Sequence, residues 1–305
     1  MAVHPLKVMS VNVHRSNDRL HALLQTCDDL DSILIQEPWF HTVATMRSDT
    51  DPLGTAQLGA PINNMWEPLI PKVTPTMTCK AVGYARKSLT RSSAIRNNTT
   101  HPLATPNSLV VNVTTQDAIT MRIINIYHAV PLTGHNLCFL FSHELDELMP
   151  TILIGDFNTH SPLWSLPGRT PSSWGGDLEE WADHNGLEVL NPHRVVTWVG
   201  SKESNHPSIL NLAFANEAAR FTNQLSSMKV SLSDSLGSDH AALSFQVYPL
   251  DHLTLQLPPT PTSYKPNLEQ RDAWMKEFAR LMPYTPAYTL MEGAPSDQSH
   301  SGVSA

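Results

Sequence analysis

The stretch Thr151-Ile-Leu-Ile-Gly-Asp-Phe-Asn-Thr-His160 guides the interpretation of the whole chain. Its apolar run, Ile152 to Ile154, is too short for a helix and predicts a buried β-strand. Asp156 and Asn158 follow two positions apart, so in an extended chain their side chains share one face. A carboxylate and an amide at a strand end suit water activation, although an Asx-rich turn is the favoured explanation when this stretch is taken alone. The choice depends on whether other strands end in the same way.

Four other predicted strands also carry polar side chains where they meet a loop. These side chains are Asn12 (strand 6–13), Glu37 (strand 32–35), Tyr127 (strand 119–127) and the pair Asp239 and His240 (strand 241–247). Polar groups at strand ends converge on a cleft in open α/β sheets. A single ending of this kind is more often a turn, but five together indicate a functional site.

Helical spacing of leucines over residues 18–27 predicts a helix, with Ser16 or Asn17 as its N-cap. This helix would lie between the strands predicted over residues 6–13 and 32–35. Strand, helix and strand in the first forty residues indicate an α/β layered fold.

The sequence also predicts the secondary structure of four further segments. Residues 40–78 contain prolines and are weakly periodic, which predicts a surface loop with a short helix or two. Residues 137–149 carry an apolar stripe typical of an amphipathic helix. A second helix is expected over residues 178–185, ended by Gly186, and residues 195–199 are expected to form a short strand.

The chain divides by composition. Residues 1–250 are expected to form one globular domain, followed by a proline-rich linker over residues 251–266. Apolar side chains at helical spacing predict a helix over residues 267–282. The small, polar residues 283–305 are expected to be disordered.

Composition also limits the class of protein. The chain has 305 residues, 41% of them hydrophobic, and a net charge of −8, which argues against a module that holds nucleic acid through a broad basic surface. Three widely spaced cysteines form neither a disulfide framework nor a metal knuckle, so a reducing, intracellular environment is expected. Neither a long apolar run nor a signal-peptide pattern is present, so no membrane association is expected.

The polar residues at the strand ends indicate the chemistry. Carboxylates and amides are hard oxygen ligands that suit Mg²⁺ or Mn²⁺ rather than zinc. The sequence has no serine nucleophile elbow and no glycine-rich phosphate loop, which argues against a serine hydrolase and an NTPase. Metal-assisted hydrolysis of a phosphate ester remains.

Five motifs occur in an order that resembles the endonuclease/exonuclease/phosphatase superfamily: Asn12, Gln36-Glu-Pro38, Asn125-x-Tyr127, Gly155-Asp-Phe-Asn158 and Ser238-Asp-His240. The resemblance covers residues 6–248. It implies a DNase I-like fold, a four-layer α/β sandwich in which helices flank two packed mixed β-sheets.

Further details resemble the apurinic-like endonuclease domains of LINE-type (non-LTR) retrotransposons. They are Asn12-x-x-Arg15-Ser16, Trp39 after the Gln-Glu-Pro motif, Thr159-His-Ser-Pro-Leu-Trp164 and Thr197-Trp198. The resemblance implies DNA as substrate, action in the nucleus as a monomer, and a reverse transcriptase that is separate or lost. Residues 272–281 resemble the junction that leads towards such a polymerase.

The resemblance also implies roles for single residues. Glu37, with Asn12 and Asp239, would hold Mg²⁺ (or Mn²⁺) against a phosphate oxygen. Arg15 and His160 would contact DNA.

The reacting groups would come from the later motifs. Asp156 would position or deprotonate the attacking water, and Asn158 would align it. His240 would stabilise charge on phosphorus, and Tyr127 would contact the phosphate or the leaving oxygen.

One residue departs from the family pattern. The segment Ser208-Ile-Leu-Asn-Leu212 carries Asn211 where an aspartate usually pairs with the catalytic histidine. An amide supplies no charge to favour a protonated imidazole, and it can select the other tautomer. Two alternatives to a DNA endonuclease therefore stay open: a catalytically impaired relic that keeps the fold and binds DNA or a partner, and an enzyme acting on another phosphate ester.

Overall fold

The computed structural model describes residues 4–48, 51–74, 77–115, 119–129, 137–200, 206–221 and 224–248, with the backbone alone for residues 46–48 and 51–56. The chain divides into Met1–Thr254 and Leu255–Ala305, and the second unit lies outside the described residues. The predicted linker, the helix over residues 267–282 and the tail therefore lie outside them too.

The first sheet has six strands in the order β13-β14-β1-β2-β6-β5. Its strands are β1 (Leu6–Asn12), β2 (Ser32–Gln36), β5 (Trp66–Leu69), β6 (Ala81–Arg86), β13 (Lys229–Ser231) and β14 (Ala242–Val247). The central pair β1 and β2 is parallel, and the pair β1 and β14 is antiparallel. The strands predicted over residues 6–13, 32–35 and 241–247 are confirmed.

The second sheet also has six strands, in the order β11-β12-β10-β9-β8-β7. Its strands are β7 (Ile95–Asn97), β8 (Ser108–Thr114), β9 (Thr120–Tyr127), β10 (Thr151–Asp156), β11 (Leu187–Val189) and β12 (Asn211–Asn216). Strand β10, the predicted central strand, is buried along its whole length, parallel to β9 and antiparallel to β12.

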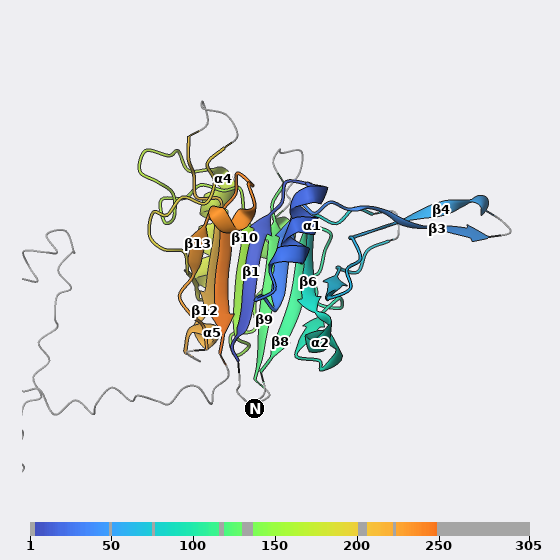
Figure 1. Cartoon of the computed structure of the whole chain (residues 1–305). Coiled ribbons are helices and arrows are strands. Elements are labelled where there is room, and N and C mark those ends of the chain that lie inside the picture. The colour runs from blue at the N-terminus through green and yellow to red at the C-terminus, as the bar shows by residue number, and fades with distance from the viewer. Residues whose placement is uncertain are drawn as a thin grey trace, which may run out of the picture. The chain divides into compact units, whose positions relative to one another are not determined.

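The two sheets pack face to face through side chains that alternate along their strands. Val8, Leu34 and Leu243 of the first sheet share one core cluster with Ile123 and Ile154 of the second. Figure 1 shows β1 lying over β9 and β10 in this arrangement. Packing the sheets in this way brings strand ends from distant parts of the chain to a common edge.

Helices cover the outer faces. Helix α1 (Asn17–Thr26) packs Leu20, Leu23 and Leu24 on the outer face of the first sheet, and each buried leucine contributes about 1.5–3 kcal/mol. The helix begins at Ser16, whose hydroxyl accepts a hydrogen bond from the Arg19 amide, so Ser16 is the N-cap.

The outer face of the second sheet is covered by α3 (Cys138–Phe141) and α4 (Ser173–His184). Leu140 of α3 and Leu178 of α4 pack in one cluster with Ile124 and Leu153 of the sheet. The order helix, sheet, sheet, helix confirms the predicted four-layer α/β sandwich. The short helices α2 (Lys87–Arg91), α5 (Glu217–Phe221) and η1 (Ser233–Ser235) lie in the connections.

Three sequence expectations are wrong. The segment 40–78 is not a loop with helices: it contains β3 (His41–Ser48), β4 (Asp51–Gly59) and the sheet strand β5. Strands β3 and β4 pair with each other as a separate two-stranded ribbon (Figure 1). Whether a weakly periodic segment forms a strand depends on the strand it pairs with, and the sequence of the segment does not reveal that partner.

The amphipathic helix expected over residues 137–149 ends at Phe141. Beyond it, the Leu145 amide donates to the side chain of Asn185, and Leu148 is 88% exposed. The strand expected over residues 195–199 reduces to bridges made by Trp198. Helix α4 is present but begins five residues earlier than expected, with Ser172 as its N-cap. No described helix is long and apolar enough to cross a membrane.

Candidate active site

The strand ends of the two sheets meet at Asn12 and Asp156. Asn12 ends β1 of the first sheet, Asp156 ends β10 of the second, and both side chains are buried. The Asn12 amide nitrogen donates to the Asp156 carboxylate over 2.9 Å and to the Glu37 carboxylate over 3.2 Å. One amide therefore joins two of the three carboxylates that the sequence singles out.

Glu37 follows β2 with a backbone φ of +45°, a strained conformation for a residue with a side chain. Its carboxylate pairs with the Arg15 guanidinium over 3.2 Å, and the Tyr127 hydroxyl donates a hydrogen bond to it. Burial, followed by the charge and hydrogen bond of Glu37, raises the pKa of Tyr127, which therefore keeps its proton at neutral pH. Tyr127 is thus a hydrogen-bond donor in this site.

Asp156 is a buried carboxylate with incomplete hydrogen bonding. It is 1% exposed, and its Oδ1 has no hydrogen-bond partner among the described residues. Burial raises the pKa of Asp156, while the neighbouring His240 and the Asn12 hydrogen bond act in the opposite direction. Gly155 before it has a φ of +149°, and a Cβ there would lie 1.9 Å from the Ile126 carbonyl oxygen. Only glycine lets β10 approach β9 this closely and deliver Asp156.

His240 lies beside Asp156 and bonds to Asn211. Its Nδ1 is 2.7 Å from the Asn211 side-chain oxygen and 3.9 Å from the nearer Asp156 oxygen. Asn211 begins β12 and is paired with Asp156 in the strand register, which explains why the three side chains meet.

Asp239 has a different environment from its neighbour. Its carboxylate accepts a hydrogen bond from the Trp198 indole over 3.1 Å, and it lines a pocket of about 340 Å³ with His14 and Arg19. Among the described residues, the hydrogen bond of the Asp239 side chain is with Trp198 and not with Glu37 or Asn12.

Asn158 and His160 follow β10 on its loop. Asn158 adopts a φ of +47°, and its amide nitrogen donates to the His128 carbonyl over 2.9 Å. His160 lies against the loop before α4, where its backbone bonds to Ser172 and its ring lies 3.5 Å from the Ser165 hydroxyl. Burial lowers the pKa of His160, so its ring is neutral at pH 7. His160 is thus set apart from the carboxylate cluster.

Part of the chain is similar to a known family of domains. Residues 121–244 match the family model described as endonuclease-reverse transcriptase. The resemblance predicted from the ordered motifs is thereby confirmed for this part of the chain, which includes Tyr127, Asp156, Asn158, Asn211 and His240. No curated protein matches the sequence significantly.

Solved structures extend the agreement in fold to the first motifs. The endonuclease domain of TRAS1, a telomere-specific non-LTR retrotransposon, aligns with a TM-score of 0.59 at 18% identity, covering 80% of this chain and 98% of that one. The AP endonuclease LMAP from Leishmania major aligns with a TM-score of 0.52 at 12% identity, covering 80% and 88% respectively. Both likenesses support the α/β sandwich fold.

Polar residues beside Asn12 and Glu37 form a support to which the sequence analysis gave no role. The Gln36 amide donates to the Ser10 hydroxyl and to the Asn125 side chain, and Asn125 donates to two carbonyls of the first sheet. Ser238 donates to the Asn12 carbonyl over 2.7 Å. Gln36, Asn125 and Ser238 belong to the five ordered motifs, and Ser10 lies two positions before Asn12. Their place in or beside these motifs could have indicated a supporting role.

The ligand set at this edge is compatible with a hard divalent cation. Among the described residues no group of three or more His, Cys, Asp or Glu side chains converges on one point. Mg²⁺ usually binds one or two protein carboxylates and keeps several waters, so it does not require such a group. Glu37 is only partly buried (14% exposed), and the unpaired Oδ1 of Asp156 could accept a water.

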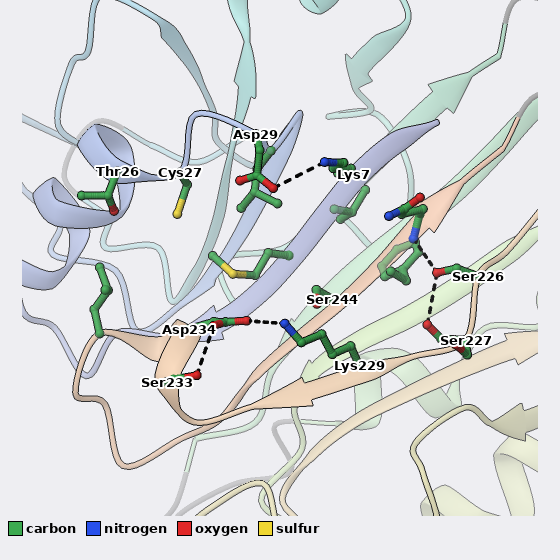
Figure 2. A pocket seen from close by; sticks show the side chains of 16 residues that line it. Lys7, Thr26, Cys27, Asp29, Ser226, Ser227, Lys229, Ser233, Asp234 and Ser244 are labelled. Atoms are coloured by element: carbon green, nitrogen blue, oxygen red, sulfur yellow. Dashed lines mark hydrogen bonds and ion pairs between the residues drawn. The ribbon is translucent and has the colours of Figure 1, made fainter. Parts of the chain in front are cut away.

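A larger pocket of about 610 Å³ lies on the outer side of the first sheet, beside the end of α1 (Figure 2). Figure 2 shows Lys7 paired with Asp29 and Lys229 paired with Asp234 in its wall. Its charges are thus neutralised internally, and none of the predicted site residues lines it.

Proposed function

We propose that this chain is a Mg²⁺- or Mn²⁺-dependent endonuclease that nicks DNA, of the type associated with non-LTR retrotransposons. The observation that carries the proposal is the Asn12 amide, which joins Glu37 and Asp156 beside His240. The endonuclease-reverse transcriptase match over residues 121–244 supports the same conclusion.

Glu37 is the proposed metal ligand, together with Asn12 and Asp239. When bound, the cation would neutralise charge on the phosphate oxygens. In the structure, the Arg15 guanidinium forms an ion pair with the Glu37 carboxylate. Arg15 is well placed to contact a DNA phosphate, because its side chain is 63% exposed.

Asp156 is the proposed acceptor for the proton of the attacking water. Its buried position raises its pKa, which brings a carboxylate closer to the value that a general base needs at neutral pH. Its unpaired oxygen can hold the water. Asn158 is proposed to align the water through its side-chain oxygen, since its nitrogen is bonded to the His128 carbonyl.

His240 and Tyr127 are proposed to stabilise the charge that develops on the reacting phosphate. Hydrogen-bond donors act most strongly when they are already oriented in a site with little water. His240 is held by Asn211, and Tyr127 remains protonated. His160 is kept as a proposed DNA contact at the edge of the site.

Nicking of supercoiled plasmid with Mg²⁺ tests the proposal. The native chain should convert plasmid to the open circular form, and Glu37→Gln and Asp156→Asn should each reduce the rate at least a hundredfold. Asp183→Asn, an exposed charge change on α4, is the matched control and should cleave as the native chain does.

Equal cleavage by the native chain and both site variants would refute the proposal. Duplex with an abasic site, RNA and a phosphomonoester serve as parallel substrates. Turnover of only RNA or the phosphomonoester would replace DNA nicking by an activity on another phosphate ester. Turnover of only the abasic duplex would restrict the nicking to abasic DNA. No turnover of any substrate by a folded, metal-loaded chain would favour the impaired relic.

A further inference from the structure

The side chain of Asn211 lies between His240 and a backbone carbonyl group. Its oxygen is 2.7 Å from His240 Nδ1, and its nitrogen is 3.1 Å from the carbonyl oxygen of Ala241. Asn211 is 1% exposed and His240 is 6% exposed, so water cannot replace these partners readily. Both ends of the amide are therefore occupied.

The Ala241 carbonyl determines which way the amide points. A carbonyl oxygen only accepts hydrogen bonds, so the group that faces it must be the amide NH₂. The reverse orientation would bring two oxygens within about 3.1 Å of each other. Because the NH₂ faces Ala241, the oxygen faces His240, and the nitrogen it faces, Nδ1, must carry a proton.

The backbone of Asn211 is also held. Its N–H donates to the Thr197 hydroxyl over 2.9 Å, and its carbonyl accepts from the Asn191 side chain over 3.0 Å. These bonds fix the backbone position from which the side chain extends, while the side chain itself is held by His240 and the Ala241 carbonyl.

We propose that Asn211 is a positioning residue that holds His240 as the Nδ1–H tautomer, with the Ala241 carbonyl fixing the orientation of the amide. The amide thus preserves the arrangement that an aspartate would enforce. Nε2 is left as the ring nitrogen available to the reacting groups, and it donates to a phosphate oxygen only when the ring carries a second proton. The negative charge that the amide lacks is supplied by Asp156, whose oxygen lies 3.9 Å from Nδ1.

This inference deepens the proposed function and rests on it for the role of Nε2, but the tautomer itself can be measured without turnover. The experiment is a two-bond ¹H–¹⁵N correlation spectrum of the chain labelled with ¹⁵N-histidine, recorded in chelator at about pH 8. The signals that disappear in His240→Gln assign His240 among the 15 histidines.

The expected result is a proton on Nδ1 of His240 in the native chain and in Asn211→Asp. Asn211→Leu, which offers no acceptor, should populate the Nε2–H form. Asn216→Asp, which makes the same charge change at the other end of β12, should leave the His240 signals unchanged. A proton on Nε2 in the native chain would overturn the proposal, whether or not the leucine variant folds.

The rate of plasmid nicking provides the second measurement. Asn211→Asp should raise the rate by no more than about tenfold, because a charge-assisted hydrogen bond is roughly twice as strong as a neutral one. Asn211→Leu should lower it by at least a hundredfold. A rise of about 10⁴ in Asn211→Asp would overturn the proposal, since that is the cost of a wrong tautomer in the Ser-His-Asp enzymes. An Nδ1–H signal in an inactive native chain would refute the proposed function and leave the tautomer assignment standing.

Discussion

Asp156→Asn is expected to stabilise the folded chain at neutral pH in the absence of metal, while it removes the proposed base. The Asp156 carboxylate is 1% exposed, and one of its oxygens has no hydrogen-bond partner among the described residues. A buried polar group without a partner costs about 1–3 kcal/mol, and more when it is charged. The asparagine keeps an oxygen for the Asn12 amide and removes the buried charge.

The magnitude follows from these contacts. A gain of about 1–3 kcal/mol in the free energy of unfolding corresponds to a rise of roughly 2–12 °C in Tm for a domain of this size. Chemical and thermal denaturation in chelator at pH 7 measure both quantities. Asp183→Asn on the exposed face of α4 is the control for the loss of one negative charge.

The gain should depend on pH in a defined direction. Burial raises the pKa of Asp156 above its unfolded value of about 4, so between these two values the folded state holds a proton that the unfolded state has released. The stability of the native chain therefore falls as pH rises through this window. The advantage of Asp156→Asn should be largest at pH 7 and should vanish below about pH 4.

Two results would refute this reasoning. One is a variant no more stable than the native chain at pH 7 while Asp183→Asn is neutral. The other is an advantage that does not shrink as the pH is lowered. Either would mean that Asp156 is well solvated or fully paired, contrary to its burial.

Three further changes have defined outcomes. Gly155→Ala should lower the free energy of unfolding, measured by chemical denaturation, by about 3 kcal/mol or more, because its Cβ would meet a backbone oxygen at 1.9 Å. The control Gly176→Ala, in the open face of α4, should raise that free energy by roughly 0.5–1 kcal/mol. Equal effects would contradict the close approach of β10 to β9. Arg15→Met should weaken duplex binding in a salt titration and lower the slope of log Kd against log salt by about one. Stability should change little, because the Arg15 side chain is 63% exposed. An unchanged slope would exclude the phosphate contact. At pH 8 a thiol reagent should label exposed Cys138 first and Cys79 only on unfolding, as followed by mass spectrometry. The reason is that burial raises the pKa of Cys79 to about 12. Early labelling of Cys79 would contradict this order.

Local patterns in the sequence predicted the elements whose partners are near in the chain or whose burial is complete. The helix over Asn17–Thr26, with its cap at Ser16, follows from leucine spacing and a capping hydroxyl. Strand β10 follows from an uninterrupted apolar run. The same patterns failed over residues 137–149, because the apolar stripe does not reveal that the Leu145 amide bonds to Asn185.

For the candidate site too, local sequence patterns predicted some features and missed those that depend on tertiary contacts. The ordered motifs predicted a type of domain and singled out Asn12, Glu37 and Asp156, which the structure brings together. They did not reveal the environment of Asp239, whose partner is the Trp198 indole. They also left the effect of Asn211 open, since an amide can present either end to a histidine.

The sequence by itself determined which residues end the core strands and which family of folds accommodates them, because strand periodicity and motif order are local properties. Only the tertiary structure decided how those ends combine. Asn12 and Asp156 are 144 residues apart and meet because two sheets pack face to face. The orientation of Asn211 is likewise decided by the Ala241 carbonyl, a backbone group that any residue at that position would supply. Contacts across the sheets depend on packing and register, and those are properties of the folded chain as a whole.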